Sequence, residues 1–407
     1  MSEGVPEHHV VLFAGAGASK AVDPASYPTT LEFFERLPES LRSHSCFTYI
    51  ESFLRKDGDR EVIDIEEMLW GLQTLRELFV DINKGRNLIG YSLKSARIAK
   101  LISNGWNFGQ LPDTISRLIP ELDELISDIH SLVFELYGEL PSKKQLNDNW
   151  IRLLQPIFSS DARLDIFTTN YDVVIESAIE LILGPSASEY FGLAGGRHKT
   201  LDISRWESSS QPKRGLLTKL HGSLDWKVKG DRIYSGDPVF TGSHEKQAII
   251  YPGFKGKSNK LFFKPFHDYL ERAISNATYI AFIGFAFRDE YISESIQNNI
   301  GDAKVTILNP DKRVVFPYRR AKPSYMPQGF DGASADVISR LALLDQSARR
   351  ASRSTTGCTR ATSRACRSRA STFQPPRYIA CRRNEVALLN PSARSSSLPG
   401  YRMRYRL

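Results

Sequence analysis

The chain has 407 residues, of which 41% are hydrophobic and 25% are charged, proportions typical of an ordinary soluble protein. This length accommodates one large domain with insertions, or two domains. No run of about 18 uncharged apolar residues occurs, so no membrane-spanning helix is expected. The first nine residues are polar and acidic and do not resemble a signal peptide, which favours a cytoplasmic location.

The positive charge of the chain belongs to its C-terminal tail. Residues 346–407 contain fourteen Arg, no Lys and one Glu, a net charge of +13, which leaves −5 on the preceding 345 residues of a chain whose formal net charge is +8. The tail is rich in Ser and Ala and lacks helical or strand periodicity, so we expect it to be disordered. Two alternatives are an arm that binds nucleic acid through its Arg and a shift of the reading frame near Asp345.

Cysteine usage argues against a metal site. Cys358, Cys366 and Cys381 all lie in the tail, and Cys46 is the one cysteine before it. Their spacings match no paired CxxC zinc pattern and imply no disulfide framework. A four-cysteine zinc site cannot form within residues 1–345, so no metal is expected there.

The first predicted elements form a strand, a glycine loop and a helix. Val10–Phe13 is an apolar run that predicts a buried strand, and it leads directly into the sequence GAGASK. Thr29 is followed three residues later by Glu32, which is the spacing of a capping box. We therefore predict that a helix begins at Thr29.

The region from about residue 35 to 160 is predicted to be mostly helical. Apolar residues recur at helical spacing over 65–82 and again over 122–136, and Gly138 is a typical helix end. We interpret this region as an insertion between the first and second core strands. Apolar stripes of this kind are packing surfaces far more often than cofactor sites.

Strand-like runs return after the insertion, and helical patterns at 173–183 and 262–275 separate several of them. The predicted strands are Arg163–Thr168, Gly215–Leu220, Ala248–Tyr251, Tyr279–Ile283 and Val305–Leu308. Alternating strands and helices predict an α/β fold whose parallel sheet is covered on both faces. Ligands of such sheets bind beyond the carboxyl ends of the strands.

Five short motifs fall at these strand ends: GAGAS (15–19), TTNYD (168–172), KLHGSLDW (219–226), the glycine of AFIGFAFRDEY (281–291) and the Asn-Pro of VTILNP (305–310). Glycines let a pyrophosphate approach backbone amides. His221 is a candidate base because histidine titrates near neutrality. Each motif also has an ordinary explanation as a turn or a packing glycine.

In combination the five motifs resemble the sirtuin superfamily, and most closely the bacterial sirtuin-like domains that act as NAD hydrolases in antiphage defence. The resemblance covers about residues 8–315, and FTTNYD together with KLHGSLDW is its most specific part. It implies a Rossmann-like parallel sheet with helices on both faces and a large helical insertion after the first strand-helix unit. The catalytic domain would span residues 1–345 and the tail 346–407.

The resemblance also implies roles for single residues. Asn170 and His221 would be catalytic: Asn170 would position a water or ribose hydroxyl at the anomeric carbon, and His221 would draw a proton from it. The implied NAD contacts are Gly15, Ala16, Gly17 and Ser19 at the pyrophosphate, Thr169 and Asp172 at the nicotinamide ribose, and Gly284, Phe285 and Asn309 at the adenosine half.

The implied activity is hydrolysis of NAD+ to nicotinamide and ADP-ribose, with NAD as substrate and no zinc. Two other hypotheses stay open: an NAD-dependent protein deacylase or ADP-ribosyltransferase, and a non-catalytic sensor of NAD or ADP-ribose. Deacylating sirtuins carry a zinc module of two cysteine pairs that residues 1–345 lack, and a sensor would not need both Asn170 and His221. The resemblance further implies a homo-oligomer, an ATPase or nucleic-acid-guided partner in defence, and no contact with membranes.

Overall fold

The computed structural model describes residues 8–58, 63–83, 111–194, 199–208, 214–229, 232–236, 246–249, 257–311, 314, 316 and 322–343. The chain divides into two compact units, Met1–Ala351 and Ser352–Leu407, and every described residue belongs to the first. The Arg-rich tail predicted from residue 346 onward lies outside the described residues. Within the described part, no helix combines the length and the apolarity that a membrane crossing requires.

Six strands form one parallel sheet in the order β11-β10-β9-β1-β2-β5. They are β1 (His9–Ala14), β2 (Arg163–Thr168), β5 (Leu217–Lys219), β9 (Tyr279–Ile283), β10 (Lys304–Leu308) and β11 (Ser324–Met326). β1 pairs with β2 on one side and with β9 on the other, so the strand order reverses at β1. Ligands of open α/β sheets bind at such a reversal. The predicted Rossmann-like sheet is confirmed.

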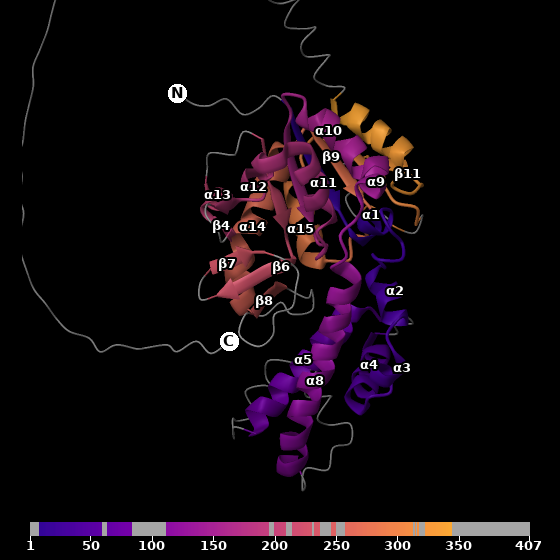
Figure 1. Cartoon of the computed structure of the whole chain (residues 1–407), viewed down its shortest axis with the longest axis vertical. Coiled ribbons are helices and arrows are strands. Elements are labelled where there is room, and N and C mark those ends of the chain that lie inside the picture. The colour runs from indigo at the N-terminus through magenta and orange to yellow at the C-terminus, as the bar shows by residue number, and fades with distance from the viewer. Residues whose placement is uncertain are drawn as a thin grey trace, which may run out of the picture. The chain divides into compact units, whose positions relative to one another are not determined.

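Helices lie on both faces of this sheet (Figure 1). They are α1 (Ala16–Lys20), α9 (Lys143–Leu146), the π-helical turn η2 (Asn147–Ile151), α10 (Arg152–Phe158), α11 (Val174–Leu183), the 3₁₀ turn η3 (Gly184–Ser186), α12 (Ala187–Tyr190), α13 (Ser204–Glu207), α14 (Lys257–Asn276), α15 (Glu290–Asn299) and a last helical stretch over 332–343. The two helical patterns predicted at 173–183 and 262–275 correspond to α11 and α14.

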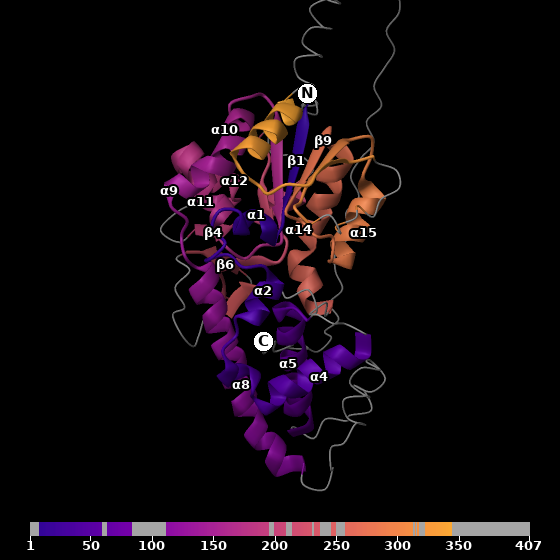
Figure 2. The same ribbon diagram turned by 90° about the vertical axis from the view of Figure 1, so that its right-hand side faces the viewer.

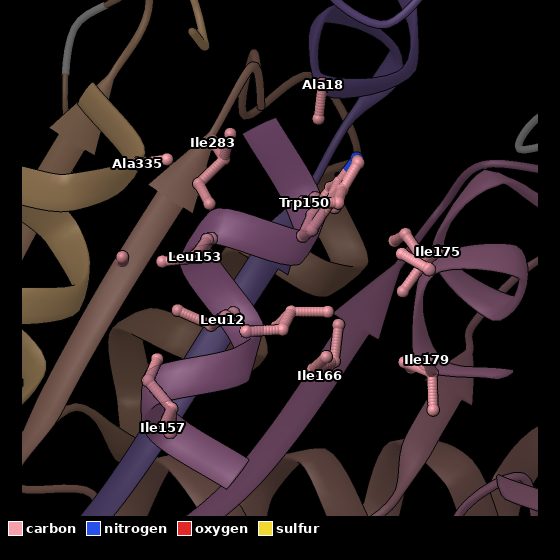
Figure 3. Packing of buried hydrophobic residues seen from close by; sticks show 14 of the residues in the cluster. Leu12, Ala18, Trp150, Leu153, Ile157, Ile166, Ile175, Ile179, Ile283 and Ala335 are labelled. Atoms are coloured by element: carbon pink, nitrogen blue, oxygen red, sulfur yellow. The ribbon is translucent and has the colours of Figure 1, made fainter. Parts of the chain in front are cut away.

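Alternate residues of the central strands face two different helical layers. Leu12 and Ile166 belong to one buried cluster with Leu153, whose helix α10 crosses these strands (Figure 3). Phe13 belongs to the cluster on the other face, together with Phe266 of α14. Because both faces are buried, β1 and β9 are nearly continuous apolar runs rather than alternating ones. β2 differs in carrying Arg163 and Asp165, which form a buried ion pair (2.8 Å).

A helical insertion separates β1 from β2 and has a hydrophobic core of its own. Its helices are α2 (Thr30–Glu35), α3 (Glu39–Arg42), α4 (Ser45–Gly58), α5 (Ile65–Asn83) and α8 (Leu111–Tyr137). Thr29 caps α2 in a capping box with Glu32, as predicted. α5 and α8 lie side by side in Figures 1 and 2. Tyr171 of the TTNYD turn packs into the core of the insertion, which joins the insertion to the sheet edge.

A second, antiparallel sheet was not predicted. Its order is β3-β4-β7-β6-β8, with β3 (Leu193–Ala194), β4 (Lys199–Leu201), β6 (Gly222–Lys229), β7 (Arg232–Ser235) and β8 (Lys246–Ile249). The run Ala248–Tyr251 was assigned to the parallel sheet, and this was wrong, because β8 pairs with β6 in antiparallel register. Tyr251 itself lies outside the described residues. A short apolar run does not reveal which sheet a strand joins.

Candidate functional site

The five motifs follow the carboxyl ends of neighbouring parallel strands. Gly15 follows β1, Asn170 follows β2, His221 follows β5, Gly284 follows β9 and Asn309 follows β10. These strand ends share one edge of the sheet, because all its strands are parallel. The fold therefore brings the five motifs to one edge of the sheet, and their role as a site stays a prediction.

The GAGAS segment is helical rather than a loop, because Gly15 is the N-cap of the five-residue helix α1. Gly15 N donates a hydrogen bond to Ile283 O (3.0 Å), and Gly17 N donates one to Gly284 O (3.2 Å). A Cβ on Gly15 would lie 2.5 Å from Gly284 O, and Gly284 itself has φ +58°. The glycines are thus needed for the close packing of the β1 and β9 ends against each other.

Asn170 ties the TTNYD turn to the GAGAS segment. Its side chain is 7% exposed, and Nδ2 donates to Gly15 O (3.0 Å) and to Ser19 Oγ (2.8 Å). Thr168 Oγ1 donates to Ala14 O (3.0 Å) and accepts from Asn170 N (3.0 Å). The polar residues at the end of β2 therefore hold the end of β1 in place.

Asp172 and Lys219 are the buried charges behind this turn. Burial raises the pKa of the Asp172 carboxyl, while the Lys219 charge and a hydrogen bond from Ser19 act against that rise. Lys219 Nζ lies 2.6 Å from Glu176 Oε1. Burial raises the pKa of Glu176 to about 7, and Lys219 again opposes it. The positive charge of Lys219 therefore partly offsets the effect of burial on two carboxyl groups, those of Asp172 and Glu176.

His221 is 6% exposed and lies in the turn between β5 and β6. Its Nε2 lies 3.1 Å from Asp289 Oδ2. Asp289 Oδ1 accepts from Ile292 N (3.0 Å), so this carboxylate also caps α15. The other ring nitrogen of His221, Nδ1, is buried and has no hydrogen-bond partner in the described part of the chain.

The strand register brings Asn170 and His221 to equivalent positions. Thr168 of β2 is paired with Lys219 of β5, and each catalytic candidate lies two residues beyond that pair. Leu220 N donates to Thr168 O (2.8 Å), which continues the pairing past the strand ends. Adjacent strands thus present both predicted residues at one edge.

Three side chains of this site were missed by sequence reasoning: Glu66, the phenol of Tyr171 and Asp289. Tyr171 OH donates to Glu66 Oε1 (2.8 Å), and the Tyr171 ring centroid lies 6.4 Å from that of His221. Burial raises the pKa of Glu66 to about 7; His221 opposes the rise, while Asp64 and Asp289 add to it. Of the three, only Asp289 could have been noticed from its local sequence, because an Asp that precedes a helical pattern is a typical N-cap.

The β9 and β10 ends form the other side of this edge. Asn309 Nδ2 donates to Phe285 O (3.2 Å), and its Oδ1 accepts from Asp311 N (3.0 Å). Phe285 is buried against Phe13, with ring centroids 5.6 Å apart. Among described residues other than glycine, Phe287 is the one with positive φ, at 55°. Such strain is often found at binding sites.

The remaining candidates are simpler. Ala16 and Thr169 are partly buried. Cys46 is a buried free thiol whose pKa burial raises. No three His, Cys, Asp or Glu side chains of the described residues come together as a metal-binding group.

Residues 165–324 match the family model described as a SIR2-like domain. This region is therefore similar to SIR2-like domains. The match runs from β2 into β11 and contains the TTNYD turn, His221, Asp289 and Gly284. It confirms the resemblance to the sirtuin superfamily that the motifs predicted. GAGAS and Glu66 lie before the SIR2-like region, so the site combines matched and unmatched parts of the chain.

Three solved structures of Sir2 proteins match this chain at low sequence identity. A Sir2 homolog in complex with NAD has 12% identity and a TM-score of 0.36, covering 82% of this chain and 89% of that one. A structure described for the mechanism and regulation of Sir2 enzymes has 13% identity and a TM-score of 0.36, covering 83% and 93%. One concerning sirtuin substrate affinity has 12% identity and a TM-score of 0.34, covering 81% and 92%. No curated protein matches the chain.

Proposed function

We propose that this protein is an NAD+ hydrolase that cleaves the nicotinamide–ribose bond to give nicotinamide and ADP-ribose. The observation that supports this most directly is the hydrogen bonding of the two ring nitrogens of His221. Its Nε2 faces Asp289, while its buried Nδ1 has no hydrogen-bond partner in the described part of the chain. A buried nitrogen without a partner is costly, so a ligand or water that bonds to Nδ1 would complete the site.

Three residues at the sheet edge would act on the NAD substrate. In the tautomer that donates Nε2–H to Asp289, Nδ1 carries the lone pair and is able to accept a proton. Asp289 would hold the ring and stabilise its protonated form, as the carboxylate of a catalytic triad does. Asp172 would supply the negative charge close to the ribose.

The proposed reaction is balanced with water as the second substrate. The C1′–N bond breaks, and its electron pair leaves with nicotinamide, whose ring becomes neutral. The water oxygen bonds to C1′, and the water proton passes to His221. The ribose becomes oxocarbenium-like in between, and fixed carboxylate and amide dipoles stabilise that charge. A positioned base is worth about 10²–10⁴-fold in rate.

Asn170 would act in two ways. Its Nδ2 holds the GAGAS segment by hydrogen bonds to Gly15 O and Ser19 Oγ. Its Oδ1 would accept a hydrogen bond from the attacking water or from a ribose hydroxyl. The remaining predicted contacts would follow the same edge, with the pyrophosphate at GAGAS and the adenosine half at Gly284, Phe285 and Asn309.

We propose NAD depletion in antiphage defence as the biological role, with a homo-oligomeric enzyme and an ATPase or nucleic-acid-guided partner. The support is the motif combination FTTNYD and KLHGSLDW together with the large helical insertion.

The test is to incubate the purified full chain with NAD, with and without an acetylated peptide, and to follow nicotinamide by chromatography. We expect release without peptide. Release that requires the peptide would show a deacylase instead. NAD that binds but stays intact under both conditions would favour a sensor.

A further inference from the structure

The helical insertion contributes a carboxylate to the His221 side of the site. Glu66 is the second residue of α5. Asp64 fixes this helix start, since its O accepts from Met68 N (3.1 Å) and its Oδ1 accepts from Glu67 N (2.9 Å). The position of Glu66 is therefore set by the capped first turn of α5.

Tyr171 connects Glu66 with His221. Its hydroxyl donates to Glu66 Oε1 (2.8 Å), and its ring lies 6.4 Å from the His221 ring at an interplanar angle of 33°. Tyr171 is 9% exposed and belongs to the insertion's hydrophobic core. A single buried side chain thus contacts the carboxylate of the insertion and neighbours the candidate base.

Several titratable groups face Glu66. They are Asp64 at its own helix start, Tyr137 on α8, Tyr171 on the TTNYD turn, His221 after β5 and Asp289 at the start of α15. Burial raises the pKa of Glu66 to about 7, and the His221 charge opposes this rise more than any other group. An ionised carboxylate close to a histidine generally favours the charged form of the imidazole.

We propose that Glu66 is a positioning residue for His221: through Tyr171 it orients the ring, and its negative charge stabilises the imidazolium that forms when His221 takes a proton. This inference rests on the proposed function of His221 as the base. Two carboxylates, those of Asp289 and Glu66, would then stabilise the protonated form of one histidine. The insertion would therefore be part of the catalytic machinery.

The first test is an NMR titration of the His221 ring in the full chain, its signal assigned by its loss in His221→Gln. Glu66→Gln keeps an oxygen that accepts from Tyr171 but cannot ionise. We expect the His221 titration midpoint to move to lower pH, because the variant removes a negative charge near the ring. The matched control is Glu77→Gln, which removes one charge from an exposed position of the same helix. It lies eleven residues on, about 16 Å along the axis, and should leave the midpoint unchanged.

The second test is nicotinamide release. Glu66→Gln should lower kcat about tenfold with KM unchanged, as expected for one coupled side chain. Tyr171→Phe, which removes only the hydroxyl, should act in the same direction, and the double variant should lose less than the sum of the two. Tyr171→Phe also provides the comparison if Glu66→Gln does not fold.

These outcomes separate the inference from the proposed function. If Glu66→Gln moves the His221 titration no further than Glu77→Gln does, the positioning role is wrong, whatever the activity. If the titration moves but the wild-type protein releases no nicotinamide, the contact stands and the hydrolase proposal fails.

Discussion

At the scale of single residues, the amide of Asn170 joins two motifs that are far apart in sequence. Its Nδ2 bonds to Gly15 O and Ser19 Oγ are both buried. An alanine at 170 removes both hydrogen bonds. Gly15 O keeps its bond from Ala18 N (2.9 Å), but Ser19 Oγ loses a buried donor, and a buried polar group that loses its partner costs about 1–3 kcal/mol. Stability and chemistry at this residue are therefore linked.

We predict that Asn170→Ala lowers the free energy of unfolding by about 1–3 kcal/mol and abolishes nicotinamide release. Urea denaturation and chromatography of the released nicotinamide measure the two effects. Asn276→Ala is the control, because Asn276 is exposed at the end of α14 and donates a local hydrogen bond to Arg272 O. An Asn170→Ala protein with wild-type stability and release would end the assignment.

Glu176 makes the stability of the fold depend on pH. Burial raises its folded-state pKa from the ordinary 4.5 to about 7. A carboxyl group with a raised folded pKa contributes stability that is complete below about 4.5 and is lost as the pH rises through about 7. Glu66 acts in the same direction and in the same window.

The free energy of unfolding should therefore fall between about pH 4.5 and pH 7, by an amount on the order of 1–3 kcal/mol for Glu176. Glu176→Gln should make that fall smaller. Glu180→Gln, an exposed change on the same helix, should leave it as in the wild type. Urea titrations at a series of pH values measure this fall. If the free energy of unfolding depends on pH in the same way in both variants, the prediction is wrong.

At the scale of elements, the ends of β1 and β9 pack without room for side chains. A Cβ on Gly284 would lie 2.4 Å from Ala18 N, and Gly284 has φ +58°. A Cβ on Gly17 would lie 3.0 Å from Gly284 Cα. Substitutions in GAGAS would thus disturb this contact before they affect any phosphate.

Gly284→Ala should destabilise the protein by about 2 kcal/mol or more, since it combines a steric overlap with an unfavourable φ. Gly301→Ala is the matched control, because nothing lies within 4 Å of its missing Cβ. The melting temperatures of the two variants, measured by thermal unfolding, test this prediction. Equal melting temperatures would mean that the β1–β9 contact does not constrain the site.

The sequence predicted the elements whose signal is local. β1 and β9 are buried on both faces, so each is a nearly continuous apolar run with clear limits. β2 is also buried throughout, although it carries Arg163 and Asp165 among its apolar residues. Four of the antiparallel strands, such as the two-residue β3, are too short to show a period. The eight-residue β6 does alternate, with Leu224, Trp226 and Val228 between polar residues, and this signal was missed. Glu66 was missed because its contact with Tyr171 spans 105 residues and comes from a different element.

At the scale of the whole molecule, the first compact unit ends at Ala351 and the described residues end at 343. The sheet, the insertion and the candidate site are all built from residues before that point. We propose that the domain of residues 1–345 carries the fold and the NAD site by itself.

Deleting residues 346–407 should therefore leave the melting temperature and the NAD affinity unchanged, with full-length protein as the reference. Calorimetry measures both quantities. A truncated chain that precipitates or shows no cooperative unfolding would mean that the Arg-rich tail belongs to the fold.

The central claim is that His221 is the base of an NAD hydrolase. The most direct measurement compares NAD affinity by calorimetry with the rate of nicotinamide release for wild type and His221→Ala. We predict an unchanged affinity and a rate lower by about 10²–10⁴-fold. A His221→Ala protein that releases nicotinamide at the wild-type rate, or one that loses affinity and rate in equal measure, would contradict this account.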